Sequence, residues 1–542
     1  MQKKGKLELT WVGKYDDEKP VEPRILLEDS EKSYGDPDSG NMLIHGDNLI
    51  ALQALQQDFA GKIKCIYIDP PYNTGSAFEY YDDDVEHSIW LDLMYKRLIL
   101  LRELLSDDGF LCCQIDDSEG SYLKILLDEV FGRNNYLNTF YIQVRYPNKT
   151  LAEDSDYQKV IEQCHVYAKQ KNLAKLNRPK AEYGIEKFKW KIIEKETGEV
   201  ITLGGKRVEI FKPGQYSIEE IQPSLTGLKE TWATGSLARV KASAGEFFEL
   251  YLANRKQIDG LGCLYKVEGI GEDGLGYRYI SGPKRATANK GKFYSGIPLK
   301  RLGELKNGGS YKYLPVSNFL DFAGNFGNCR LEGGVGFTGG KKPEILLKTL
   351  LEYYSNPGDI ILDSFLGSGT TAAVSLKMHR HFIGIEYGEH CYTLCKPRLD
   401  AVVDGEQTGI SKDINWQGGG GYHFYELAPS LLVKNDKLPI YQINPTYTFE
   451  MLCEAICKIE GFKYRPQDVF HGHSSEKRFI HVTTEFVNAE YIRSLSQHLD
   501  EGQSLLIYAT KIQSDMILPD NIEVKKIPKD LLDKCNFESE VP

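Results

Sequence analysis

The chain has 542 residues, of which 41% are hydrophobic and 26% charged, a composition typical of a globular protein that is too long for a single hydrophobic core. There is no apolar run of about eighteen residues and no apolar leader, so the sequence predicts neither a membrane span nor a secretory signal, and a cytoplasmic location is expected. The net charge of −11 is unevenly spread, because residues 141–330 hold 31 Lys and Arg against 21 Asp and Glu. This excess of +10 in an otherwise acidic chain is the pattern expected of a domain that contacts phosphates.

The N-terminal part of the chain is predicted to be an irregular arm over residues 1–40, because charges cluster there between Gly and Pro breaks. A short apolar strand then leads to Asp47, and a helix is predicted over 49–59. Asp47 lies near the N-terminus of this helix and is suited to capping it.

A distinctive corner follows the apolar run 63–68, where Asp69-Pro70-Pro71-Tyr72 ends a predicted strand. The Asp69 carboxylate and the Pro70 carbonyl can both accept hydrogen bonds from an exocyclic amine, and an exposed Tyr72 ring can stack on the base that carries it. Pro70 and Pro71 fix φ and remove backbone donors, which makes the corner stiff. Since an ordinary turn would also explain four such residues, the interpretation needs a second signal.

Strands and helices alternate beyond this corner as far as residue 150, which favours a doubly wound sheet. Residues 76–86 are predicted to form a loop over a substrate pocket, followed by a helix over 87–105 and a strand over 109–115. From 150 to 335 the alternation is lost, and Gly and aromatic residues are interspersed with Lys and Arg. Such a mixture suits phosphate contacts and the reading of base edges.

The second signal is a strand, a Gly-rich turn and a helix over residues 360–376, which is typical of a nucleotide-like cofactor site. The next strand, 381–386, ends in an acid placed to hold ribose hydroxyls. A lysine at the start of a helix predicted over 344–354 is suited to a cofactor carboxylate. The candidate cofactor-binding residues in these segments are Lys342, Asp363, Phe365, Gly367, Ser368, Gly369, Thr370 and Glu386.

The motifs DPPYNTG, KKPEIL, LDSFLGSGTT and FIGIE, in this order, resemble the amino-group DNA methyltransferases of the β class, in which the catalytic half precedes the cofactor half. The segment NWQGGGGYHFYEL is similar to the modification (Mod) subunits of type III restriction–modification systems. The resemblance implies an α/β, doubly wound, Rossmann-like domain built from 41–150 and 335–430. It also implies a mixed α+β target-recognition domain over 151–334 and a small α/β interaction domain over 431–542.

The same resemblance implies transfer of a methyl group from S-adenosylmethionine to adenine N6 in double-stranded DNA, by base flipping. Asp69, Pro70, Pro71 and Tyr72 are then the catalytic residues, and the chemistry needs no metal. The resemblance also implies that Asp47 lies beside the cofactor, as a further cofactor-binding residue. A homodimer and a separate restriction (helicase–nuclease) subunit are implied as partners. Three alternatives stay open: methylation of cytosine N4, methylation of a protein glutamine or of RNA, and a catalytically silent DNA-binding specificity subunit of a defence complex.

Overall fold

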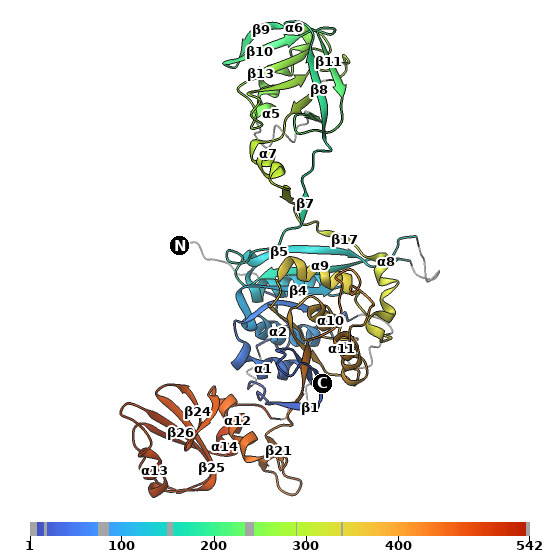
Figure 1. Ribbon diagram of the computed structural model, residues 1–542. Coiled ribbons are helices and arrows are strands. Elements are labelled where there is room, and N and C mark those ends of the chain that lie inside the picture. The colour runs from blue at the N-terminus through green and yellow to red at the C-terminus, as the bar shows by residue number, and fades with distance from the viewer. Residues whose placement is uncertain are drawn as a thin grey trace. The chain divides into compact units, whose positions relative to one another are not determined.

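The computed structural model describes residues 8–15, 19–73, 86–148, 156–232, 243–288, 290–337 and 340–537 (Figure 1). The chain divides into two compact units: unit 1 combines Met1–Asn177 with Ser317–Pro542, and unit 2 is Arg178–Val316. The loop predicted over 76–86 lies outside the described residues apart from its last residue. Within the described ranges, no helix is both long and apolar enough to span a bilayer.

A ten-stranded mixed sheet organises unit 1. In spatial order its strands are β1 (Leu26–Gly35), β20 (Gly421–Leu427), β2 (Met42–His45), β19 (His381–Glu386), β18 (Ile360–Asp363), β3 (Ile63–Ile68), β4 (Leu105–Ile115), β6 (Ile161–Ala168), β5 (Tyr136–Gln143) and β17 (Phe319–Asp321). The strands from β20 to β4 are parallel to one another. β1 and β6 pair antiparallel at either side of this parallel block.

Helices cover both faces of the sheet, as expected for an α/β architecture. Ile44 packs in one apolar cluster with α1, α2 and α3, whereas its neighbour Leu43 packs in another with α10 and α11. Adjacent residues of a strand point to opposite faces, so these two clusters lie on opposite sides of the sheet. The helices of this region are α1 (Asn48–Phe59), α2 (His87–Leu104), α3 (Gly120–Leu127), η1 (Asp128–Gly132), η2 (Arg133–Asn135), α8 (Ala323–Phe326), η4 (Cys329–Gly334), α9 (Glu344–Tyr354), α10 (Thr370–Lys377), η5 (Cys391–Cys395) and α11 (Lys396–Val403).

The strands that carry the two sequence signals, β3 and β18, are neighbours in this sheet although about 290 residues separate them. They are parallel, with Cys65 opposite Ile361 and Ile66 opposite Leu362, so their carboxyl ends lie at the same edge. The chain leaves β3 towards β4 on one side and β18 towards β19 on the other. This is a topological switch point, where ligands of open α/β sheets bind.

The expectation of an irregular arm over 1–40 is wrong for Leu26–Gly35, which forms strand β1. This strand pairs with β20, with Leu26 opposite Leu427 and Gly35 opposite Gly421. Edge strands commonly carry charged side chains, which prevent pairing with other molecules. Because β1 carries such charges, the segment lacks the apolar pattern from which a strand is predicted.

Unit 2 is smaller than the predicted 151–334 domain, because β6 and β17 on either side of it complete the sheet of unit 1. It is built on an eight-stranded antiparallel sheet accompanied by short helices. In spatial order the strands are β11 (Tyr216–Glu220), β8 (Phe188–Glu194), β12 (Leu228–Trp232), β15 (Lys292–Ser295), β14 (Tyr277–Ser281), β13 (Leu264–Glu268), β10 (Lys206–Phe211) and β9 (Glu199–Leu203). The other elements are a strand pair, β7 (Lys180–Glu182) with β16 (Tyr311–Tyr313), and the helices α5 (Ser243–Phe247), η3 (Phe248–Leu252), α6 (Lys256–Asp259) and α7 (Leu299–Lys306).

The C-terminal part of unit 1 is built on a five-stranded sheet. In spatial order the sheet consists of β23 (Lys463–Gln467), β24 (Phe470–Ser475), β25 (Arg478–Val487), β26 (Ser504–Ile512) and β27 (Ile522–Lys526). Its other elements are β21 (Leu432–Lys434), β22 (Tyr441–Ile443), α12 (Phe449–Glu460), α13 (Ala489–Ser496) and α14 (Lys529–Leu532). Helix α12 and strands β25 and β26 share one apolar core.

Candidate active site

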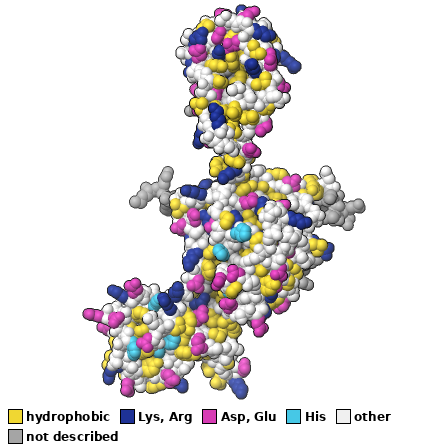
Figure 2. Space-filling model, viewed as in Figure 1, with side chains coloured by type: hydrophobic (Ala, Val, Ile, Leu, Met, Phe, Trp, Pro, Cys, Tyr) yellow, Lys and Arg dark blue, Asp and Glu magenta, His cyan; other side chains and the backbone are white. Residues whose placement is uncertain are grey.

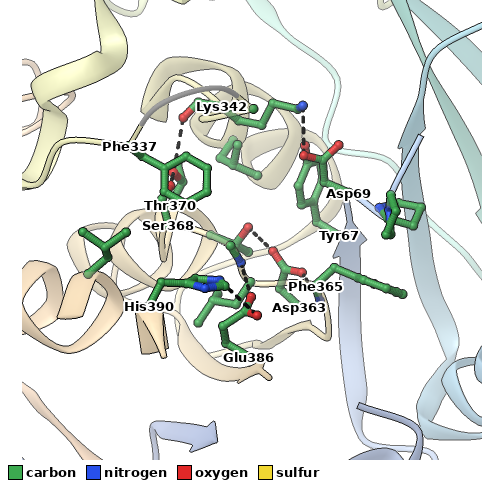
Figure 3. Close-up of a pocket in the computed structure, with 18 of the residues that line it drawn as sticks. Tyr67, Asp69, Phe337, Lys342, Asp363, Phe365, Ser368, Thr370, Glu386 and His390 are labelled. Carbon is green, nitrogen blue, oxygen red and sulfur yellow. Dashed lines mark hydrogen bonds and ion pairs between the residues drawn. The ribbon is translucent and has the colours of Figure 1, made fainter. Parts of the chain in front are cut away.

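A cavity of about 570 Å³ opens at the carboxyl ends of β3 and β18 (Figure 3). This volume is in the range of small-molecule binding sites. Most of the residues named from the sequence line it: Asp69, Pro70, Pro71, Tyr72, Lys342, Asp363, Phe365, Gly367, Ser368, Thr370 and Glu386. The corner after β3 and the Gly-rich turn after β18 therefore share one cavity.

The Asp69 carboxylate has a hydrogen-bond donor on each oxygen. The Tyr72 hydroxyl donates to Oδ1 at 2.7 Å, and the Lys342 ammonium lies 2.9 Å from Oδ2 (Figure 3). Burial raises the pKa of Asp69 above its usual range, although the Lys342 charge partly opposes this effect. Burial would lower the pKa of Lys342, but the Asp69 and Glu162 carboxylates outweigh it and raise that pKa to about 12. Lys342 therefore remains a cation in the cavity wall.

The Tyr72 ring is half-buried, so the expectation of an exposed ring is wrong for this structure. Its hydroxyl lies 2.9 Å from Glu162 Oε2 as well as near Asp69, and the Lys342 ammonium lies 5.0 Å from the ring centroid. Sequence reasoning missed Glu162 because it stands on β6, far along the chain from both motifs. Two carboxylates and one ammonium thus surround the tyrosine.

The corner itself is fixed from outside the cavity. The Trp90 indole N–H of α2 donates to the Pro71 carbonyl at 2.9 Å. Asn73 adopts a left-handed conformation with φ of +56°, and its side-chain amide donates to the buried carboxylate of Glu119 at 2.9 Å. Asparagine tolerates this backbone region better than most residues. These contacts hold the end of β3 in one conformation.

The Gly-rich turn is organised by Asp363. Its carboxylate accepts hydrogen bonds from the Phe365 N–H at 3.0 Å and from Thr371 Oγ1 at 2.6 Å. Burial raises the pKa of Asp363 to about 7. Gly367 has φ of +57°, and a Cβ placed on it would meet no atom within 4 Å. Gly367 is also one of the residues that line the cavity.

Glu386 ends β19 at the predicted place and is 1% exposed. Its Oε2 accepts a hydrogen bond from the Gly367 N–H at 2.6 Å, and its Oε1 lies 3.0 Å from His390 Nε2 (Figure 3). The Tyr387 N–H donates to Oε1 at 2.8 Å. Glu386 therefore joins the Gly-rich turn to the segment after β19. His390 also lines the cavity, and no motif in the sequence indicated it.

Three predicted cofactor residues differ from the others in their contacts or in their distance from the cavity wall. The Lys342 ammonium faces Asp69, while its backbone carbonyl accepts a hydrogen bond from Thr370 Oγ1 at 3.2 Å. Asp47 and Gly369 are not among the described residues that line the cavity. Asp47 caps α1 and lies 3.2 Å from Arg97, and Gly369 precedes α10 with φ of +78°.

A buried ionic network supports the Gly-rich turn, and no pattern in the sequence indicated it. Glu344 lies 2.8 Å from both Lys377 Nζ and Arg398 Nη2, and all three side chains are essentially buried. Arg398 also donates to Thr370 Oγ1 at 2.7 Å and to the Ser368 carbonyl at 3.1 Å. The network links the start of α9 to the start of α10, and so fixes the cofactor side of the cavity.

Unit 2 holds 24 Lys and Arg against 16 Asp and Glu. On the face shown in Figure 2, these charges are interspersed rather than gathered in one patch. Exposed aromatic rings accompany them: Trp232 is 58% exposed, with the Lys292 ammonium 4.8 Å from its ring centroid, and Tyr311 and Tyr313 are also exposed. Rings and cations together are suited to contacts with nucleic acid.

Known proteins that are similar to this chain include DNA methylases. A family model described as a DNA methylase matches residues 63–397, which include both motifs and the whole of unit 2. The chain is 33% identical over 446 residues to a probable type III restriction-modification enzyme HindVI Mod subunit of Haemophilus influenzae, covering 78% of this chain and 58% of that protein. It is 24% identical over 558 residues to the EcoP15I Mod subunit of Escherichia coli, covering 89% and 82%.

Among solved structures, the chain is similar to the PvuII DNA methyltransferase (cytosine-N4-specific), with a TM-score of 0.34 and 12% identity over 73% of this chain and 94% of that one. The chain spans little more than half the length of several curated relatives that it matches. The family model covers more than half of the chain, and the chain belongs to this family of DNA methylases.

Proposed function

We propose that this chain transfers a methyl group from S-adenosylmethionine to the N6 amine of adenine in double-stranded DNA, as the modification subunit of a type III restriction–modification enzyme. One observation carries the proposal: an amine-binding corner and a Gly-rich turn line the same cavity, so two ligands can meet there. The relatives described as type III Mod subunits support the biological setting.

The cavity residues fit S-adenosylmethionine. Open space lies beside Gly367, where a side chain would intrude, and the Phe337 and Phe365 rings provide apolar wall. The carboxylates of Asp363 and Glu386 offer acceptors for amine and hydroxyl groups. We assign cofactor binding to these residues together with Ser368 and Thr370. The cofactor supplies a methyl group already activated by a sulfonium, so the protein's main task is positioning.

The catalytic corner, residues 69–72, binds and orients the amine of the target base. An amine inside a duplex cannot reach the cavity, so the base must leave the stack at a cost of a few kcal/mol. The Asp69 carboxylate and the Pro70 carbonyl accept the two amine hydrogens, which localises the nitrogen lone pair towards the cofactor side. Once the amine is methylated it carries an extra proton, and Asp69 takes that proton up. A Tyr72 ring stacked on the base would return ~1–3 kcal/mol.

The remaining parts of the chain have supporting roles in this proposal. Unit 2 recognises the DNA target, which its excess of Lys and Arg and its exposed Trp232 support. The C-terminal sheet serves as an interaction region. Because the relatives' names describe one subunit of an enzyme, we extend to this chain a restriction subunit as partner, together with a homodimer.

The test is the variant Asp69→Ala, assayed with a labelled methyl donor and duplex DNA. We expect methyl transfer to fall by at least ~10³-fold, because both the amine acceptor and the proton acceptor are lost. Calorimetry should find cofactor binding within about threefold of wild type, since Asp69 does not contact the Gly-rich turn. Asp117→Asn, which removes the charge of an exposed acid, is the control and should retain activity. Turnover by Asp69→Ala at the wild-type rate would remove Asp69 from the mechanism.

A further inference from the structure

Glu162 belongs to neither of the two motifs, yet its carboxylate touches the catalytic corner. It stands on β6, which pairs antiparallel with β4 beside the cavity strand β3. Its Oε2 lies 2.9 Å from the Tyr72 hydroxyl and 3.4 Å from Lys342 Nζ. Gln114 Nε2 donates to the same oxygen at 2.6 Å, and Gln114 Oε1 accepts from the Tyr67 hydroxyl at 2.7 Å. A chain of buried groups therefore fixes where this carboxylate lies.

Glu162 and Asp69 compete for the same two donors. Tyr72 has a single hydroxyl proton, and acidic oxygens lie 2.7 Å and 2.9 Å from its oxygen. Lys342 likewise approaches Asp69 at 2.9 Å and Glu162 at 3.4 Å. Asp69 therefore has both of its oxygens engaged in this structure. A substrate amine that displaces either donor would leave a polar hydrogen unsatisfied in the cavity wall unless a second acceptor is within reach, and such a loss is costly.

We propose that Glu162 is a positioning residue that receives the Lys342 ammonium and the Tyr72 hydroxyl when the substrate amine takes their place on Asp69. The inference rests on the proposed methyl transfer, for which Asp69 must be free to accept the amine. Both donors already touch Glu162, so small side-chain rotations are enough to complete the exchange. Gln114 holds the receiving oxygen in place, which makes the second acceptor preorganised rather than recruited.

The arrangement also has an electrostatic consequence. The groups that act on Asp69 are Lys342, which lowers its pKa, Glu162, which raises it by repulsion, and the Tyr72 hydroxyl, which lowers it by donating. Tyr67 and Asp363 also face this carboxylate. Removing the charge of Glu162 removes a repulsion and so lowers the pKa of Asp69. Because Asp69 must be ionised to accept the amine, the acidic limb of the rate profile should move to lower pH.

The experiment compares the full-length wild type with Glu162→Gln, which keeps the shape and removes the charge. We expect kcat/KM for duplex DNA to fall at least ~10-fold, with the cofactor affinity unchanged, because Lys342 and Tyr72 stay on Asp69. The acidic limb of the kcat/KM profile should move to lower pH. Glu352→Gln makes the same chemical change at a half-exposed position on α9 and should match wild type in both measurements.

A merely structural role of Glu162 would lower activity without moving the acidic limb of the pH profile. An unmoved acidic limb in Glu162→Gln therefore overturns the proposal, and so does a kcat/KM of this variant equal to that of wild type. Glu162→Asp keeps the charge but shortens the reach, so the limb should stay in place while kcat/KM falls about threefold or more. If Glu162→Gln does not fold, wild-type kcat/KM in Glu162→Asp overturns the proposal. Failure of the proposed function is distinguishable, because the wild-type protein itself would then transfer no methyl group to DNA.

Discussion

Replacing Gly367 by valine tests whether the Gly-rich turn holds the cofactor. A Cβ placed there would meet no atom within 4 Å, so the main cost to the folded protein is the left-handed φ of +57°. That backbone conformation costs a non-glycine residue about 1–2 kcal/mol. The added side chain would project into space that the cavity provides, since Gly367 is one of its lining residues. The loss of affinity for S-adenosylmethionine should therefore exceed what strain alone explains.

Gly358 supplies the matched control. It also has a left-handed conformation, with φ of +85°, and a Cβ there would likewise meet nothing within 4 Å, but it does not line the cavity. Gly367→Val and Gly358→Val thus carry a similar backbone cost and differ in where the side chain projects. By calorimetry we expect at least a 100-fold loss of cofactor affinity for the first, about 2.8 kcal/mol, and less than threefold for the second. Equal affinities in the two variants would refute the assignment of the turn.

Two further predictions concern buried charges. Glu344→Ala leaves the cations of Lys377 and Arg398 without their shared partner, so the free energy of unfolding in chemical denaturation should fall by about 3–5 kcal/mol. The loss should lie towards the lower end of this range because Lys377 keeps its ion pair with Glu406. A loss below about 1 kcal/mol would contradict this reasoning. Asp363 has its pKa raised by burial to about 7, so the folded protein binds this proton more tightly than the unfolded chain, and wild-type stability should fall as pH rises from about 4 to 7. Asp363→Asn lacks this pH dependence, so the difference in melting temperature between the variant and wild type should shift in favour of the variant as pH rises from about 4 to 7. A difference that stays constant over this pH range would contradict the reasoning.

Much of the cofactor side of the site could be predicted from the sequence because its signals are local. A strand that ends at Asp363, a turn with glycines and a following helix are all contiguous, and helix α9 has the predicted bounds Glu344–Tyr354. The pairing of β3 with β18 follows less directly, from the rule that doubly wound sheets place ligand sites where the strand order reverses. The structure brings the two signals together at that point.

The residues that sequence reasoning missed depend on contacts between distant segments. Glu162 contacts Tyr72 and Lys342 only because β6 pairs with β4, whereas the sequence places this segment in the recognition domain. The direction of the Lys342 ammonium depends on which carboxylates surround it in three dimensions, which no local pattern encodes. Strand β1 was missed for a different reason: its charges resemble those of a loop, whereas its pairing with β20 is what makes it a strand.

Mass analysis of nucleosides from duplex DNA, after incubation with this protein and isotopically labelled S-adenosylmethionine, is the decisive experiment for the proposed adenine methylation. We expect a labelled methyl group on adenine N6 with the wild-type protein, and no labelled adenine after incubation with Asp69→Ala. Label on cytosine N4 would contradict the choice of base. DNA without label, in the presence of a protein that binds both cofactor and DNA, would contradict the enzymatic assignment itself.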